Sequence, residues 1–308
     1  MSPRVIASTV ATAALAGALL AGGCGSRPGV ADPDTAVSVV ATTTQVGDFA
    51  RAVGGRRASV DQILEPNSDP HEYEPRPSDA RAVENADVVL RSGGDLDTWT
   101  SALTESGGHA RLVTLSGAVH KRSDDPHWWQ DPRNAVLAVA AIRDALVRAD
   151  PAGGPAYDRN AARYTARLER LDRSVAACVA RVPRAGRKLV TSHDALGYYA
   201  HRYGLRLVGT VIPSLSSQAQ PSSRDVNRLV SQIRRERVEA IFPESSLNPK
   251  LERAVSRESG ATGGGALWAD TLGPRGSSGS TYIRSIQANT AAIVRGLSGG
   301  RTDCRPRA

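Results

Sequence analysis

Histidine is scarce in this 308-residue sequence, and two of its six copies lie in matching acidic, proline-flanked segments. The first segment reads DPHEYEP (69–75) and contains His71, and the second reads DPHWWQDP (125–132) and contains His127. Neutral imidazole is a common ligand of divalent metals, and a nearby carboxylate usually fixes its tautomer. Because proline restricts the backbone of both segments, the rings can be held ready before a metal arrives. The repeat therefore favours a shared metal-binding task.

The second half of the sequence offers two further donors, His193 and Asp270. Three imidazoles and one carboxylate close a four-coordinate shell around Zn²⁺ well. The same set can accept Mn²⁺, although carboxylate-rich sites suit that ion better. Several acidic residues are candidates for fixing the orientation of the imidazole rings without binding the metal: Asp69, Glu72, Asp125, Asp131, Asp194 and Glu244.

The other three histidines are interpreted as ordinary surface residues. His109 and His120 lie in polar loops, and His201 lies on a predicted helix face. A single loop histidine is most often a surface or capping residue, so the metal hypothesis rests on the four donors taken together.

The elements that must position these donors alternate along the chain, as in α/β proteins with parallel sheets. The sequence predicts four strands in each half, with helices between them. The strands are expected at 37–43, 58–64, 86–92 and 111–115, then at 187–192, 205–212, 238–244 and 265–270. The helices are expected at 78–86, 97–106 and 133–150, then at 195–203, 222–237, 248–259 and 279–297.

Residues 157–182 separate the two sets and show apolar side chains at steps of three and four, without glycine or proline. This pattern predicts one long helix that joins two similar lobes; a packed helix of a single domain is the alternative. The expected organisation is a signal peptide (1–23), a tether (24–36), an N-terminal lobe (37–150), a linking helix (151–184), a C-terminal lobe (185–299) and a tail (300–308).

All four candidate donors fall at the carboxyl ends of predicted strands, two in each half. Open α/β sheets bind ligands at the carboxyl ends of their strands. If the two sheets present those edges to each other, the four side chains converge in a cleft between the lobes.

The N-terminus predicts export. Arg4 precedes an apolar, alanine-rich run (5–23) that ends at Cys24. A transmembrane anchor is the alternative, but the run barely reaches the roughly 20 residues that a span requires. LLAGGCGS resembles a bacterial lipobox, with Ala21 where leucine is commonest, so Cys24 is expected to be acylated and to hold the protein on the outer face of the membrane.

The composition and the remaining cysteines narrow the functional class. Hydrophobic residues make up 40%, which is globular, and the formal charge of +8 comes mainly from arginine. No basic block is interleaved with aromatic residues, so nucleic-acid binding is not expected. Cys178 and Cys304 could pair in an exported protein, or could remain apart.

Five segments carry a resemblance to a known family: PNSDPHEYEPRPSD (66–79), DPHWWQDPRN (125–134), TSHDALGYYAHRYGL (191–205), FPESSLNPK (242–250) and LWADTLGP (267–274). Over residues 37–298 the chain resembles the metal-binding lipoproteins of bacterial ABC importers for zinc and manganese, the cluster A-I or ZnuA/TroA-like solute-binding proteins. The resemblance implies two lobes, each with a four-stranded, mostly parallel sheet, joined by one long helix. It also implies metal ligands at His71, His127, His193 and Asp270.

The resemblance further implies a monomeric, non-enzymatic receptor that delivers metal to an ABC-transporter permease. Manganese-selective members often have glutamate where this chain has His193, which favours zinc, yet some members with three histidines and an aspartate are associated with manganese. Many zinc members carry a histidine-rich loop before the second ligand. Here the corresponding segment, SGAVHKRSDD (116–125), holds one histidine.

Two other classes remain as alternatives. A zinc hydrolase would need an open coordination position and a general base, whereas a fourth protein ligand is expected here and no HExxH motif is present. Glu244, at the end of a predicted strand, is the residue that could serve as the general base of a hydrolase. We assign it instead the role of orienting a metal ligand. A surface adhesin would keep its function after loss of the four ligands.

Overall fold

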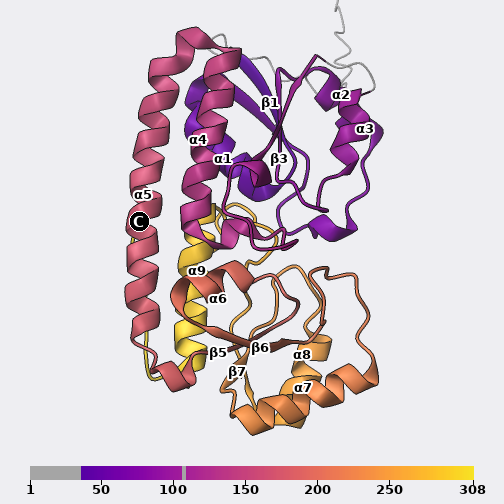
Figure 1. Ribbon diagram of the computed structural model, residues 1–308, viewed down its shortest axis with the longest axis vertical. Helices are drawn as coiled ribbons and strands as arrows, with labels where there is room; N and C mark the ends of the chain where they lie inside the picture. The colour runs from indigo at the N-terminus through magenta and orange to yellow at the C-terminus, as the bar shows by residue number, and fades with distance from the viewer. Residues whose placement is uncertain (1–35, 106–108) are drawn as a thin grey trace, which may run out of the picture. The chain divides into compact units, whose positions relative to one another are not determined.

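The computed structural model describes residues 36–105 and 109–308. The predicted signal peptide, Cys24 and most of the predicted tether lie outside the described residues. The described chain contains two groups of parallel strands with helices packed around them (Figure 1). The α/β prediction is therefore confirmed.

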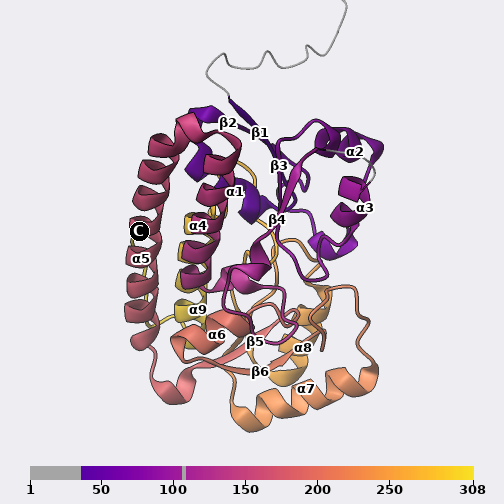
Figure 2. The same cartoon turned by 45° about the horizontal axis from the view of Figure 1, so that its top comes forward.

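The N-terminal sheet has four parallel strands in the order β2-β1-β3-β4. Helices α1 and α4 pack against it beside α5, while α2 and α3 lie at its other side (Figure 2). Its strands are β1 (Val37–Ala41), β2 (Ala58–Gln62), β3 (Val88–Arg91) and β4 (Arg111–Thr114). Its helices are α1 (Thr44–Gly54), α2 (Pro77–Glu84), α3 (Trp99–Glu105) and α4 (Pro132–Ala149).

The first helix, α1, was not predicted. It begins after Thr43, whose hydroxyl accepts a hydrogen bond from the amide of Val46. Val46, Phe49 and Val53 are fully buried at helical spacing, which is the signal that could have found it. The apolar strand before α1 and the glycines at the C-terminal end of α1 obscured that pattern.

The C-terminal half repeats the order in shorter pieces, with β5 paired to β6 and β7 paired to β8. A parallel bridge between Thr191 and Phe242 joins the two ladders. The strands are β5 (Lys188–Thr191), β6 (Arg206–Thr210), β7 (Ala240–Ile241) and β8 (Thr262–Gly263). The helices are α6 (Gly197–Tyr203), α7 (Ser223–Glu236), α8 (Lys250–Ser259) and α9 (Tyr282–Leu297).

The prediction of a strand at 265–270 was wrong. Leu267 makes one isolated bridge, to Glu244, and the neighbouring backbone bonds mainly to side chains. The amide of Trp268 donates to Asn289, and the amide of Asp270 donates to the carboxylate of Glu244. Because these donors have side-chain acceptors, the segment forms no ladder, and the chain bends at Ala269 and Asp270.

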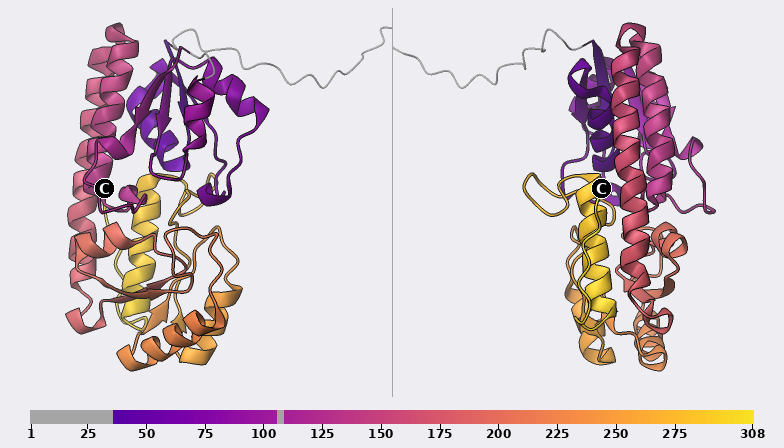
Figure 3. Two further views of the ribbon diagram at one scale, coloured as in Figure 1. Left: turned by 45° about the vertical axis from the view of Figure 1, so that its right-hand side comes forward. Right: turned by 90° about the vertical axis from the view of Figure 1, so that its left-hand side faces the viewer.

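Helix α5 (Gly154–Ala180) confirms the helix predicted over 157–182. It runs beside both groups of strands, with α9 next to its C-terminal half (Figure 3). Its buried face includes Tyr157, Leu168, Leu171 and Val175. Cys178, near its end, forms a disulfide with Cys304 in the C-terminal tail, which answers the question that the sequence left open. Across residues 36–105 and 109–308, no helix is both long and apolar enough to cross a bilayer.

Candidate metal centre

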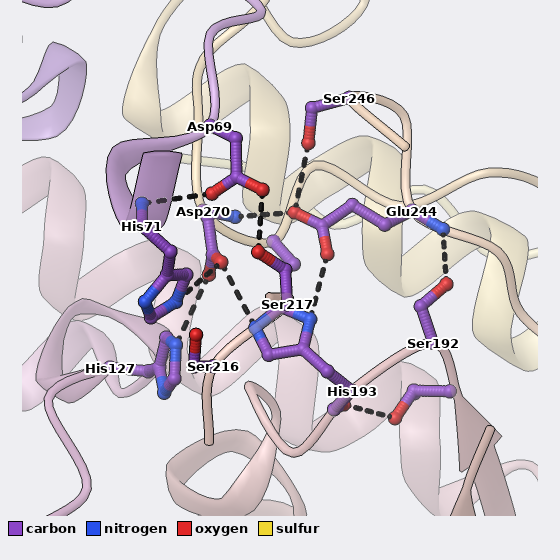
Figure 4. Close-up of polar contacts among 12 residues, drawn as sticks. Asp69, His71, His127, Ser192, His193, Ser216, Ser217, Glu244, Ser246 and Asp270 are labelled. Atoms are coloured by element: carbon purple, nitrogen blue, oxygen red, sulfur yellow. Dashed lines mark hydrogen bonds and ion pairs between the residues drawn. The ribbon is translucent and has the colours of Figure 1, made fainter. Parts of the chain in front are cut away.

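The structure brings together the four donors singled out in the sequence. One ligand atom from each of His71, His127, His193 and Asp270 lies within 4.8 Å of all the others. Figure 4 shows the three imidazoles gathered around the aspartate. The side chains are almost wholly buried, from 0% exposed for His127 to 4% for His71.

Asp270 is at the centre of this group. Its carboxylate oxygens lie 3.2 Å from Nε2 of His71, 3.3 Å from Nε2 of His127 and 3.0 Å from Nε2 of His193. The contacts are close enough for ion pairs, but they are not aligned as hydrogen bonds. Each of these nitrogens and both oxygens therefore lacks a hydrogen-bond partner among the described residues. Buried polar atoms that face the same point without forming hydrogen bonds to each other can all bind one metal ion at that point.

The two Asp-Pro-His segments share one local hydrogen bond, from the amide of the histidine to the carboxylate of the aspartate. Asp69 accepts a hydrogen bond from the amide of His71 at 2.9 Å, and Asp125 accepts one from the amide of His127 at 3.0 Å. Asp125 also lies 2.8 Å from Nδ1 of His127. That contact fixes the ring so that Nε2 faces the centre.

The other two donors are oriented by Glu244. One of its carboxylate oxygens lies 3.0 Å from Nδ1 of His193, and the other accepts from the amide of Asp270 at 3.1 Å. Ser192 accepts a hydrogen bond from the amide of Glu244 and donates one to the buried carboxylate of Glu252. Glu244 therefore holds two candidate ligands at once and is itself held in place.

Hydrogen bonds also connect loops from the two halves around the centre. Trp129 and Gln130, which follow His127, both donate to the carbonyl of Ala269, next to Asp270. Ser217, in the loop after β6, donates a hydrogen bond at 2.5 Å to the carboxylate oxygen of Asp69 that does not bond to the amide of His71. No sequence pattern indicates these contacts, because the partners are far apart along the chain.

The electrostatics follow from one buried carboxylate among three imidazoles. Burial lowers the pKa of His193, but Asp270 and Glu244 raise it by more, and the net pKa lies well above the ordinary value. For His71 the same opposition, with Asp270 dominant among the raising influences, leaves a raised pKa. Burial alone would raise the pKa of Asp270, yet the histidines hold it well below its usual range. The pocket therefore favours concentrated positive charge beside Asp270.

The sequence of the chain matches the model of a known protein family. The model of the family described as "ZnuA: Zinc-uptake complex component A periplasmic" matches residues 39–296. The chain belongs to the ZnuA family.

Proteins similar to this ZnuA-family chain align with most of its length. It is 33% identical over 288 residues to the manganese-binding lipoprotein MntA of Halalkalibacterium halodurans, covering 91% of this chain and 95% of that one. The iron-binding protein YfeA of Yersinia pestis is 31% identical over 268 residues, 84% of this chain and 86% of YfeA. The solved structure of the periplasmic zinc-binding protein TroA from Treponema pallidum superposes with a TM-score of 0.80 at 26% identity, covering 85% of this chain and 99% of TroA.

Two acids that the sequence proposed as orienting groups have other contacts in this ZnuA-family structure. Asp131 was expected beside His127, but its carboxylate caps α4 and pairs with Arg133. Asp194 was expected beside His193, whose Nδ1 instead faces Glu244. Asp194 is half-buried, and burial followed by the charge of Asp125 raises its pKa. Both expectations relied on nearness along the chain, which does not by itself determine where a side chain points.

Proposed function

We propose that this protein is an extracytoplasmic receptor that captures one divalent metal ion between its lobes and delivers it to the permease of an ABC importer. His71, His127, His193 and Asp270 supply the ligands. The observation that carries the proposal is the convergence of these four side chains from both halves of the chain on one buried centre. The ZnuA-family membership supports the transport role.

Three features of the donor set fit a transition-metal ion. Imidazole and carboxylate are ligands that zinc accepts in a tetrahedral shell. Asp125 contacts Nδ1 of His127, and Glu244 contacts Nδ1 of His193. Metal-bound histidines commonly have such a carboxylate partner on the ring nitrogen that does not bind the metal. A fourth protein ligand leaves no position for the water that a zinc hydrolase activates, so binding rather than catalysis is the role we propose.

Zinc is the ion that we propose, with manganese as the second candidate. Three nitrogen donors favour zinc over the harder manganese ion. The manganese-binding relative MntA supports the second candidate. Elemental analysis of the purified protein, followed by competitive titration with Zn²⁺ and Mn²⁺, tests both. One tightly bound zinc per chain is expected; no saturable site would contradict the receptor, and preferential manganese binding would replace zinc.

We propose the same organisation as the sequence indicated: a signal peptide (1–23), a lipid-anchored tether (24–36), lobes at 37–150 and 185–299, and a linking segment at 151–184. Acylation of Cys24 would hold a monomeric receptor near its permease. Relatives named as lipoproteins support this anchor. A Cys24→Ala protein is expected to leave the membrane fraction, and one that stays fully membrane-bound would contradict the anchor.

Metal uptake by cells separates the receptor from an adhesin. Cells that carry a His127→Ala protein should lose metal uptake if the protein is a receptor. A contact function that persists in the same cells would favour the adhesin. Size-exclusion chromatography of the purified protein tests the monomer.

A further inference from the structure

One of the surface pockets lies away from the metal centre, on the helical side of the molecule. It is a surface pocket of about 390 Å³ where α1, α5 and α9 meet. These helices can be followed in the right-hand view of Figure 3. None of the four candidate metal ligands lines it.

Three arginines give this pocket its charge. Arg51 of α1 and Arg163 and Arg167 of α5 line it, and all three are exposed. Arg51 donates to the amide oxygen of Gln62, and Arg163 donates to that of Asn160, each at 2.6 Å. Within the described parts of the chain, none of the three forms an ion pair with a carboxylate. Most of their N–H donors remain available.

The start of α9 adds a further donor. Of the amides in its first turn, that of Tyr282 donates to Asp48, and that of Arg284 donates to the hydroxyl of Thr281. The amide of Ile283, which lines the pocket, has no acceptor within residues 36–105 and 109–308. An unpaired amide at the start of a long helix favours a negatively charged ligand.

Asp48 is the one acidic residue in the pocket lining. Its carboxylate accepts from the hydroxyl of Tyr164 and from the amide of Tyr282, and burial raises its pKa while Arg51 and Arg167 act in the opposite direction. Three guanidinium groups against one carboxylate leave an excess of two positive charges even when Asp48 is ionised. The pocket therefore remains complementary to an anion.

We propose that this pocket binds a phosphate-type oxyanion, either free in solution or as the headgroup of an anionic lipid. The planar fork of arginine donors matches phosphate oxygens, which accept such bonds in pairs. The pocket is roomier than a bare oxyanion requires, so an organic substituent on the phosphate also fits. The three arginines and the Ile283 amide would share the oxyanion.

A pair of matched double variants tests the site. Arg163→Gln with Arg167→Gln removes two charges from the pocket. Arg170→Gln with Arg173→Gln removes two exposed charges from the same helix outside it, where neither arginine has a partner among the described residues. Calorimetric titration with inorganic phosphate at low ionic strength should show one saturable site in the native protein. We expect binding to weaken at least about tenfold in the pocket variant and less than about twofold in the control, since each charge-assisted hydrogen bond lost costs about that factor.

Vesicles distinguish the two sources of the phosphate. Phosphatidylglycerol and phosphatidylcholine vesicles would be compared in the Cys24→Ser background, which cannot carry the proposed acyl anchor. Capture by phosphatidylglycerol alone, lost only in the pocket variant, assigns the site to a lipid headgroup; saturable binding of free phosphate alone assigns it to a soluble anion. Equal weakening in both double variants, or no response to either ligand, would overturn the proposal. Metal titration should be unchanged in all variants, so this test is independent of the receptor function.

Discussion

The two halves of the molecule supply two donors each to one centre, but they hold them in different ways. In the N-terminal half, each histidine is fixed by an aspartate two residues earlier in its own segment. In the C-terminal half, His193 and Asp270 are both fixed by Glu244, which lies far from each of them along the chain. One half thus uses two independent local turns, and the other uses one shared carboxylate.

The sheets differ in the same sense. Strands β1 and β2 pair over five residues, and β3 and β4 over four. In the C-terminal half, β5 and β6 also pair over four, but β7 and β8 pair over only two, and the chain around Asp270 is held largely by side chains. A change in the N-terminal half should therefore affect one ligand, whereas a change at Glu244 should affect two.

The largest effect on metal binding is expected for Asp270→Asn. This change removes the charge shared by all three imidazoles, and metal affinity should fall by more than the roughly 10–100-fold that loss of an outer partner costs. Competition with a chromophoric chelator measures it. Asp61→Asn, which makes the same change on an exposed strand residue, should leave affinity unaltered. Affinity within a few-fold of the native value in the Asp270 variant would remove it from the centre.

The next effect tests the shared carboxylate directly. Glu244→Gln keeps the side-chain size but removes the charge that faces His193, and weakens the support of Asp270. We expect metal affinity to fall by up to about a hundredfold, near the upper end for outer partners of metal ligands. The same chelator competition measures it, and circular dichroism checks that the fold persists.

The matched change in the other half is Asp125→Asn, which alters the support of His127 alone. A loss of about tenfold is expected, at the lower end for such partners. The order of the two losses, measured under the same conditions, decides the comparison. If Asp125→Asn costs as much as Glu244→Gln or more, the C-terminal half has no special dependence on a shared carboxylate.

The same contrast explains what the sequence could predict. The Asp-Pro-His turns are local, so type and spacing were enough to find His71 and His127. Contacts made by distant partners left weaker signals: Asp131 was placed beside His127 because it is near in sequence, and its carboxylate caps a helix instead.

Glu244 lies between these two cases. Its position at the end of a predicted strand suggested an orienting role, but the pairing with both His193 and Asp270 required the fold. Likewise, the apolar run before Asp270 favoured a strand, yet Asn289 and Glu244 take the backbone donors that a ladder would need. Tertiary contacts overrode the local pattern in that segment.

Protons compete with metal mainly in the C-terminal half. The pKa of His193 lies well above its ordinary value and that of His71 is also raised, whereas a metal requires both nitrogens unprotonated. Binding should therefore release protons, and affinity should fall as pH falls through these raised pKa values, by about tenfold per pH unit for each proton released. Titrations from pH 8 to pH 6 in buffers of different ionisation enthalpy measure this. In Glu244→Gln the pKa of His193 should be lower and the pH dependence shallower; an unchanged slope would contradict that link.

The smallest effect on the centre is expected from loss of the disulfide, which lies outside both modes of support. Cys304→Ala opens a link between residues 126 apart, and the free energy of unfolding should fall by about 2–4 kcal/mol because the unfolded chain regains freedom. Metal affinity should stay within about twofold, since the tail keeps its hydrogen bonds to Gln287 and Ser174 and contacts none of the ligands. Chemical denaturation and chelator competition on the same samples measure the two quantities. A parallel loss of affinity would mean that the position of α5, to which both halves are attached, sets the spacing of the donors, and the contrast between the halves would then depend on that helix.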